Sequence, residues 1–401
     1  MVKIDHIHFY VENAQVWRDW FVHHLGFEAI DSGITSVHTC TEVVKSGVVY
    51  FLLSSPILPT SPVAEFLSKH PPGVADVAFA VEDVADAIAQ AQVYGAKILQ
   101  PIQEHQIGDV SLKWSKIAAW GGLSHTLIER HSAGEAGEQG SRGAALLYDR
   151  LRVACFPGGV RLRSVTEGQG SRGEAILSSL PFPLAVPSSL SLTITAIDHI
   201  VLNVPAGDLE RAVAWYENIL DFQPQQMFKI KTDRSALHSQ VMVSRNGNVQ
   251  IPINEPASGN SQIQEFLDVN RGAGIQHIAL KTTNIVSAIA QFRASGLSLL
   301  SVPQTYYKRL QQRPRLPLSS QEFEAIAQQE ILVDWKEDTS PEAQQNVPLL
   351  LQIFTQPIFG QPTFFFEFIE RRYQVQGFGE GNFRALVEAI ESEQIKRDMR
   401  E

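Results

Sequence analysis

The chain of 401 residues is long enough for two or three domains, and its 44% of hydrophobic residues supply the material for a core. A formal net charge of −10 argues against a nucleic-acid partner, because phosphate binding needs a basic face. Two cysteines cannot make a disulfide framework, and no apolar run reaches the roughly 18–20 residues of a membrane span. The first residues do not have the pattern of a signal peptide. We therefore expect a cytoplasmic protein without a membrane partner.

The first predicted elements recur later in the chain. The strand that contains Ile-Asp-His-Ile at residues 4–7 has a counterpart with the same four residues at 197–200. Residues 73–99 align without a gap on residues 274–300, and both stretches combine an apolar strand with apolar residues at the three- and four-residue spacing of a helix. Ordered matches of this kind indicate that the chain consists of two related halves.

Each half is expected to contain two modules in the order strand, helix and then several strands. This order predicts an α+β fold of the βαβββ type, in which the helix covers one face of a curled sheet and the other face is free to surround a ligand. Residues 132–193, rich in Gly, Ser, Arg and Pro, are predicted to link a first domain at 1–131 to a second at 194–401. Residues 336–347 are predicted as an exposed loop, and residues 382–397 as an amphipathic helix that closes the ligand pocket.

The two halves differ at three equivalent strand positions. The first half has His6, Asp76 and Thr126, whereas the second has the candidate metal ligands, which are His199, His277 and Glu367. Two imidazoles and one carboxylate on separate strands are what a facial Fe(II) site needs, since they leave adjacent coordination positions open. A single buried histidine is more often a core residue. Glu367, however, lies in an almost continuous apolar strand, where an unpaired carboxylate would be costly to bury.

The second half resembles the 4-hydroxyphenylpyruvate dioxygenases of the vicinal oxygen chelate superfamily. The matching stretches include Pro-Ile-Asn-Glu-Pro at 252–256, Gly-Ala-Gly-Ile-Gln-His-Ile-Ala-Leu-Lys at 272–281 and Gln-Gly-Phe-Gly-Glu-Gly-Asn-Phe at 376–383. The first half is more loosely similar, to the domain of that family that has no working metal site. The resemblance implies the vicinal oxygen chelate fold, with a lid helix at the C-terminus.

The same resemblance implies the roles of individual residues. It makes His199, His277 and Glu367 the ligands of Fe(II), and it places ten further residues around the substrate. The polar members would form hydrogen bonds and the aromatic members would pack against the substrate ring: Ser239, Asn254, Gln262, Gln276, Gln352, Phe354, Phe365, Phe378, Asn382 and Phe383. Gln276 adjoins a ligand on a strand, where neighbouring side chains point to opposite faces. Turn formation and core packing are the structural alternatives for the polar and aromatic members, respectively.

The implied activity is the conversion of 4-hydroxyphenylpyruvate and dioxygen into homogentisate and CO2, for tyrosine breakdown or for quinone and tocopherol precursors, by a homo-oligomer. Two related alternatives are a hydroxymandelate synthase, which hydroxylates the benzylic carbon of the same substrate, and an extradiol catechol dioxygenase, which releases no CO2. A third alternative is a ligand-binding relative without catalytic activity, although such a module would not need all three metal ligands.

Overall fold

The computed structural model describes residues 1–35, 37–107, 110–132, 193–231, 236–335, 347–373, 375, 377–379 and 382. The elements of the first half are β1 (Lys3–Tyr10), α1 (Ala14–Leu25), β2 (Glu28–Thr35), β3 (Thr39–Ser46), β4 (Val49–Pro56), α2 (Pro62–Lys69), β5 (Gly73–Ala80), α3 (Val84–Val93), β6 (Ile98–Ile107), β7 (Val110–Ala118) and β8 (Ser124–Ser132). The elements of the second half are β9 (Ile194–Asn203), α5 (Leu209–Leu220), β10 (Phe222–Lys231), β11 (Ala236–Ser244), β12 (Gln250–Pro256), α6 (Gln262–Asn270), β13 (Gly274–Thr282), α7 (Ile285–Ala294), α8 (Gln304–Gln312), α9 (Ser320–Gln328), β14 (Leu332–Trp335), β15 (Leu349–Phe354) and β16 (Phe365–Arg372).

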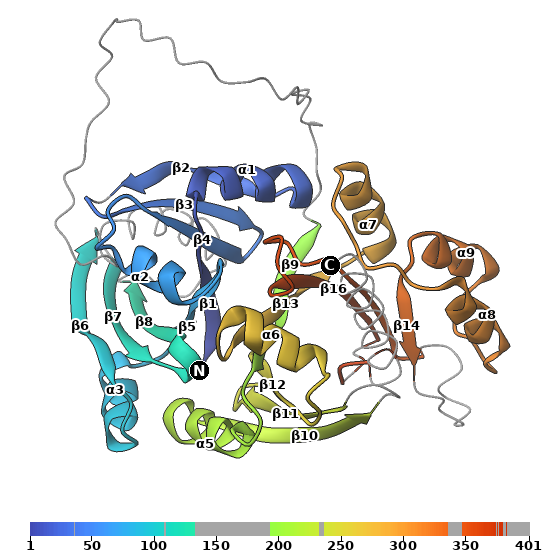
Figure 1. The fold of residues 1–401 in the computed structure, drawn as a ribbon. Coiled ribbons are helices and arrows are strands. Elements are labelled where there is room, and N and C mark those ends of the chain that lie inside the picture. The colour runs from blue at the N-terminus through green and yellow to red at the C-terminus, as the bar shows by residue number, and fades with distance from the viewer. Residues whose placement is uncertain are drawn as a thin grey trace, which may run out of the picture.

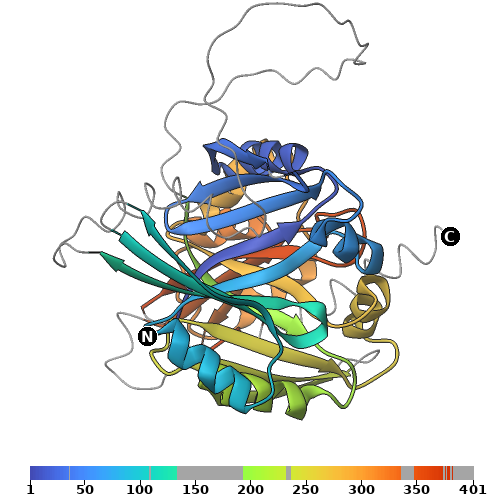
Figure 2. The same ribbon diagram turned by 90° about the vertical axis from the view of Figure 1, so that its left-hand side faces the viewer.

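The two halves form sheets with the same strand order. The first sheet runs β2-β3-β4-β1-β5-β8-β7-β6, and the second runs β10-β11-β12-β9-β13-β16-β15-β14. Each sheet therefore joins two strand-helix-strand modules along a central pair, β1 with β5 and β9 with β13, and that pair is antiparallel in both halves. Figure 1 shows both curled sheets with helices at their outer faces, and in Figure 2 the blue-to-teal strands of the first sheet cross in front of the second. The predicted α+β fold of two related halves is confirmed.

Equivalent residues begin equivalent helices in the two halves. Glu129 in β8 accepts a hydrogen bond from the backbone N–H of Val84, at the start of α3, at 2.8 Å. Glu370 in β16 accepts one from the N–H of Ile285, at the start of α7, at 2.7 Å. A buried carboxylate in this place satisfies a free helix N–H and interacts favourably with the helix dipole. Helices α8 and α9 have no counterpart between α3 and β6, so the second half carries an insertion that the repeat did not predict.

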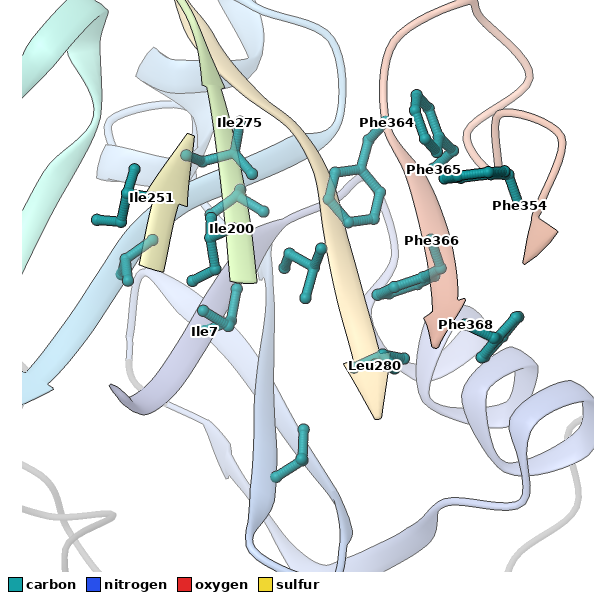
Figure 3. Packing of buried hydrophobic residues seen from close by; sticks show 14 of the residues in the cluster. Ile7, Ile200, Ile251, Ile275, Leu280, Phe354, Phe364, Phe365, Phe366 and Phe368 are labelled. Carbon is teal, nitrogen blue, oxygen red and sulfur yellow. The ribbon is translucent and has the colours of Figure 1, made fainter. Parts of the chain in front are cut away.

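Aromatic side chains join the two halves in one hydrophobic core. The ring of Phe9 in β1 meets that of Phe364 edge-on at 5.2 Å, and the rings of Phe51 and Phe366 stack at 5.9 Å. In Figure 3, which labels part of this core, Phe365 lies beside Phe354, and the two rings are 6.2 Å apart. Because successive side chains of a strand point to opposite faces, packing of Phe364 and Phe366 against the first half directs Phe365 and Glu367 to the other face of the sheet.

Three predictions fall largely outside the described residues. The predicted linker at 132–193 and loop at 336–347 are described only at their ends, and of the predicted helix at 382–397 only Asn382 is described. The linker, the loop, the helix and the domain bounds that depend on them remain predictions. No helix within the described ranges combines the length and apolar character needed to cross a membrane.

Candidate metal centre

Strand register brings the three candidate ligands to one face of the second sheet. Ala279 in the central strand β13 is paired with His199 of β9 on one side and with Glu367 of β16 on the other. Directly paired residues point to the same face, and His277 shares that face because it lies two residues before Ala279. The small side chain of Ala279 leaves the space between its neighbours open. The three predicted ligands therefore converge.

The separations between the ligand atoms suit a metal ion. Oε2 of Glu367 lies 3.2 Å from Nε2 of His199 and 3.6 Å from Nε2 of His277. All three side chains are buried, and one nitrogen or oxygen atom of each lies within 4.8 Å of those of the other two. Within the described residues, this is the group of three histidine, cysteine or acidic side chains that converges closely enough to hold an ion. Two imidazole nitrogens and a carboxylate oxygen fit Fe(II) and leave further coordination positions open.

A bulge in β9 explains how His199 is oriented. The register against β13 passes from His199 to Ile197 in one step, so Asp198 is an extra residue in β9. Because a bulge redirects a side chain, Asp198 can turn toward the side chain of its own neighbour. Its Oδ1 accepts a hydrogen bond from Nδ1 of His199 at 2.9 Å. This bond orients the ring so that Nε2 faces Glu367, where a bound metal ion would take the place of the Nε2 proton.

The electrostatics of the group attract one positive charge. Burial by itself would lower the pKa of His199, but the carboxylates of Glu367 and Asp198 raise this pKa to about 9. Burial, followed by the charge of His199, lowers the pKa of His277 well below its usual value. Arg371, the nearest basic residue to Glu367 in the sequence, pairs with Asp198 instead. Glu367 therefore lies against the two imidazoles, and a cation bound between the three side chains would balance its negative charge.

The equivalent place in the first half is built differently. Asp76 accepts hydrogen bonds from the hydroxyls of Ser124 and Thr126, both at 2.7 Å. The ammonium group of Lys116 lies 3.8 Å from the same carboxylate. The buried carboxylate in this half is thus matched by hydroxyl groups and an ammonium group. That this half has no working metal site stays a prediction.

A cavity of about 440 Å³, including its opening to solvent, lies next to the three ligands. Six of the predicted substrate-binding residues line it: Ser239, Asn254, Gln352, Phe354, Phe378 and Asn382. Ser239 and Asn254 are paired across β11 and β12, and Oδ1 of Asn254 is buried without a hydrogen-bond partner. The cavity therefore offers free hydrogen-bonding capacity on one wall and phenyl rings on another.

Gln352 connects this wall to the metal ligands. Its side-chain N–H donates to Oε1 of Glu367 at 2.8 Å and to the carbonyl of Phe378 at 3.2 Å. Its carbonyl oxygen accepts a hydrogen bond from the side chain of Asn382 at 3.0 Å. These three bonds fix the carboxylate of Glu367 and two residues near the C-terminus in one arrangement.

The other four predicted substrate-binding residues lie elsewhere. Gln262 begins α6, and Gln276 adjoins His277; both are buried but are not among the described walls of the cavity. Phe365 also lies outside these walls. Its ring stacks on that of His277 at 4.8 Å, so it packs against a candidate metal ligand. Phe383 lies outside the described residues.

The sequence interpretation missed three wall residues and two residues behind the ligands. Val201, Phe228 and Pro252 line the cavity, but their apolar side chains cannot be told from core residues by their pattern. Asp198 accepts a hydrogen bond from Nδ1 of His199, and Arg371 in turn donates to Asp198. A signal for these two was present, because Asp precedes the histidine in both halves and Ile-Glu-Arg recurs in the equivalent strands β8 and β16.

Known proteins share this architecture over the whole chain. Models of the Glyoxalase/Bleomycin resistance protein/Dioxygenase superfamily match residues 3–112 and 198–311. The solved structure of a mutant of 4-hydroxymandelate synthase from Streptomyces coelicolor covers 98% of this chain and 98% of its own, with a TM-score of 0.74. Its sequence is 22% identical, so the likeness establishes the fold alone.

Two proteins with curated descriptions are considerably more similar in sequence. The 4-hydroxyphenylpyruvate dioxygenase of Caenorhabditis briggsae is 35% identical, over 99% of this chain and 93% of its own length. That of Dictyostelium discoideum is 34% identical, over 99% of both chains. Identity at this level along the entire length, together with the vicinal oxygen chelate fold of both halves, shows that the chain belongs to the 4-hydroxyphenylpyruvate dioxygenase family.

Proposed function

We propose that the chain binds Fe(II) through His199, His277 and Glu367 and converts 4-hydroxyphenylpyruvate and dioxygen into homogentisate and CO2. The observation that carries the proposal is the convergence of the three buried side chains in the lining of a cavity that also contains amide and phenyl side chains. His199, His277 and Glu367 would hold Fe(II) here with open coordination positions, which would allow a 2-oxo acid to chelate the metal beside dioxygen. The two relatives described above, which match over 93% and 99% of their own lengths, are named for this activity.

The chain's own residues would bind and orient the substrate. The unpartnered Oδ1 of Asn254 can accept a hydrogen bond from a phenol, and Ser239 lies opposite it on the neighbouring strand. Phe354 and Phe378 present rings to the same cavity and would hold the aromatic ring between them by apolar contact. Gln352 would keep the carboxylate of Glu367 in place, so that substrate and ligands meet in a fixed geometry.

The test of this proposal is the identity of the product. The purified chain is loaded with Fe(II) without oxygen, mixed with 4-hydroxyphenylpyruvate labelled at its carboxyl carbon, and exposed to dioxygen. Homogentisate, released CO2 and consumed dioxygen are then expected in equal amounts. The control variants are His277→Ala, which should abolish turnover, and His6→Ala in the other half, which should preserve it.

Other products would identify the alternatives. Hydroxymandelate with CO2 would assign the chain to benzylic hydroxylation, and a ring-cleaved product of a catechol without CO2 would assign it to extradiol cleavage. Iron-loaded protein that binds 4-hydroxyphenylpyruvate and consumes no dioxygen would identify a binding module. The predicted homo-oligomer is tested separately by light scattering of the purified chain.

A further inference from the structure

Arg371 contacts both the residue that orients a metal ligand and the chain that follows β16. Its Nε and Nη2 donate to the two carboxylate oxygens of Asp198, each at 2.7 Å. Its Nη1 donates to the carbonyl of Gly377 at 2.7 Å and to that of Val375 at 3.3 Å. One planar guanidinium group therefore holds a carboxylate with one edge and the backbone with another, a geometry that a lysine cannot reproduce.

These contacts form a closed ring of interactions around His199. Asp198 holds Nδ1 of His199, and Arg371 connects Asp198 to the carbonyl of Gly377. Phe378 follows Gly377, and its ring returns to meet the imidazole of His199 edge-on at 5.0 Å. The direction of the metal ligand and the position of an aromatic cavity wall are thus set by the same side chain.

The repeat provides an internal comparison. Asp5 is the extra residue of a bulge in β1, it accepts a hydrogen bond from Nδ1 of His6 at 2.8 Å, and it pairs with Arg130 in β8. The ion pair and the bulge are therefore present in both halves. In the half that holds the His-His-Glu group, the arginine also donates to the carbonyl of Gly377, which adjoins Phe378 in the cavity wall.

We infer that Arg371 is a positioning residue that couples the orientation of the metal ligand His199 to the placement of Phe378 against the substrate. This inference rests on the proposed function and extends it. Without Arg371, Asp198 loses its buried partner and can turn away from His199, while the backbone carbonyl of Gly377 loses its donor. Both metal binding and substrate binding should then weaken, through two different contacts of one side chain.

The experiment compares Arg371→Met and Arg371→Lys with Arg130→Met, which removes the equivalent ion pair from the other half. Co(II) serves as the metal probe, because its visible absorption reports the ligand geometry without turnover. Arg371→Met should weaken Co(II) binding about 10- to 100-fold, the usual effect of removing a partner behind a metal ligand, and should alter the Co(II) spectrum. Arg371→Lys keeps the charge, so its affinity for Co(II) should lie between those of Arg371→Met and the wild type. Arg130→Met should leave the affinity and the spectrum unchanged.

The coupling to Phe378 is tested by a double-mutant cycle on KM for 4-hydroxyphenylpyruvate. Arg371→Met should raise KM in the wild-type background and have little further effect in Phe378→Ala, since residues that act together are not additive. Equal Co(II) affinities and spectra for Arg371→Met and Arg130→Met, or additive effects on KM, would overturn the inference. Co(II) affinity is measured without substrate, so a chain that binds Co(II) and forms no homogentisate overturns the proposed function alone.

Discussion

A pair of glycine substitutions near the C-terminus tests whether Gln352 supports the metal centre. Gly377 and Gly379 both have a positive φ, of 92° and 70°. An added Cβ at Gly377 would meet nothing within 4 Å, whereas one at Gly379 would lie 2.2 Å from Oε1 of Gln352 and 3.0 Å from Cδ2 of Leu350. Gly379→Ala must therefore displace the side chain that holds Glu367, and Gly377→Ala must not.

The expected magnitudes follow from the contacts. Both variants carry the cost of a left-handed alanine, about 1–2 kcal/mol. Gly379→Ala additionally weakens the hydrogen bond from Gln352 to the charged Glu367, and a bond of this kind contributes about 1.5–3 kcal/mol. We therefore expect the free energy of unfolding of Gly379→Ala to be lower than that of Gly377→Ala by about 1.5–3 kcal/mol, and its affinity for Fe(II) to be lower by at least about tenfold.

Urea unfolding of both variants gives the difference in stability, and anaerobic competition with a chromophoric chelator gives the affinities for Fe(II). The cost of the backbone conformation cancels in the comparison, so the remaining difference reports the displacement of Gln352. Equal stabilities and equal affinities for the two variants would refute the role assigned to Gln352.

Three further predictions concern the ligands, the pH dependence and the contact between the halves. Alanine substitution of any ligand should remove most bound Fe(II), as measured by metal analysis after desalting, whereas His6→Ala should retain it; the ligand variants are His199→Ala, His277→Ala and Glu367→Ala. Burial lowers the pKa of His125 to about 4, so between pH 6.5 and 4 the unfolded chain binds a proton that the folded chain does not. His125 should therefore contribute about 1.4 kcal/mol per pH unit to the loss of stability on acidification through this range, beside the contribution of buried His8. Urea titrations should show a slope smaller by about that amount in His125→Gln, and an unchanged slope would contradict the assignment. Gly121→Ala would place its Cβ 2.4 Å from the Cβ of Ala273, whereas Gly95 also has a positive φ and has nothing within 4 Å. The midpoint of thermal unfolding should therefore drop further in Gly121→Ala than in Gly95→Ala. Equal midpoints would contradict a tight contact between Gly121 and Ala273.

The repeat explains why the fold and the convergence of the three candidate ligands could be predicted from the sequence. Two copies of one pattern place His199, His277 and Glu367 at equivalent strand positions, and strand register then brings them together. The repeat also preserves Asp198 and Arg371, but the sequence does not show that their side chains pair with each other. This ion pair joins two strands that flank β13 and depends on a bulge, which alters the alternation of side chains and leaves no mark in the hydrophobic pattern.

The walls of the cavity were only partly predictable for a related reason. Polar residues such as Asn254 stand out in an apolar strand, whereas Val201 and Phe228 look like any other core residue until the curvature of the sheet is known. Phe365 shows the converse: the pattern placed it correctly on the face of Glu367, and yet it packs on His277 instead of lining the cavity. Which residues share a face follows from the period of the strand, but which of them reach the substrate depends on packing.

The most direct measurement of the central claim is an anaerobic titration of the chain with Fe(II) in the presence of 4-hydroxyphenylpyruvate. A weak visible charge-transfer band of an iron-chelated 2-oxo acid should grow until the iron equals the protein, and Glu367→Ala should not produce it. Fe(II) that binds to the wild-type chain without this band, or a band that persists in Glu367→Ala, would contradict the assignment of the metal centre.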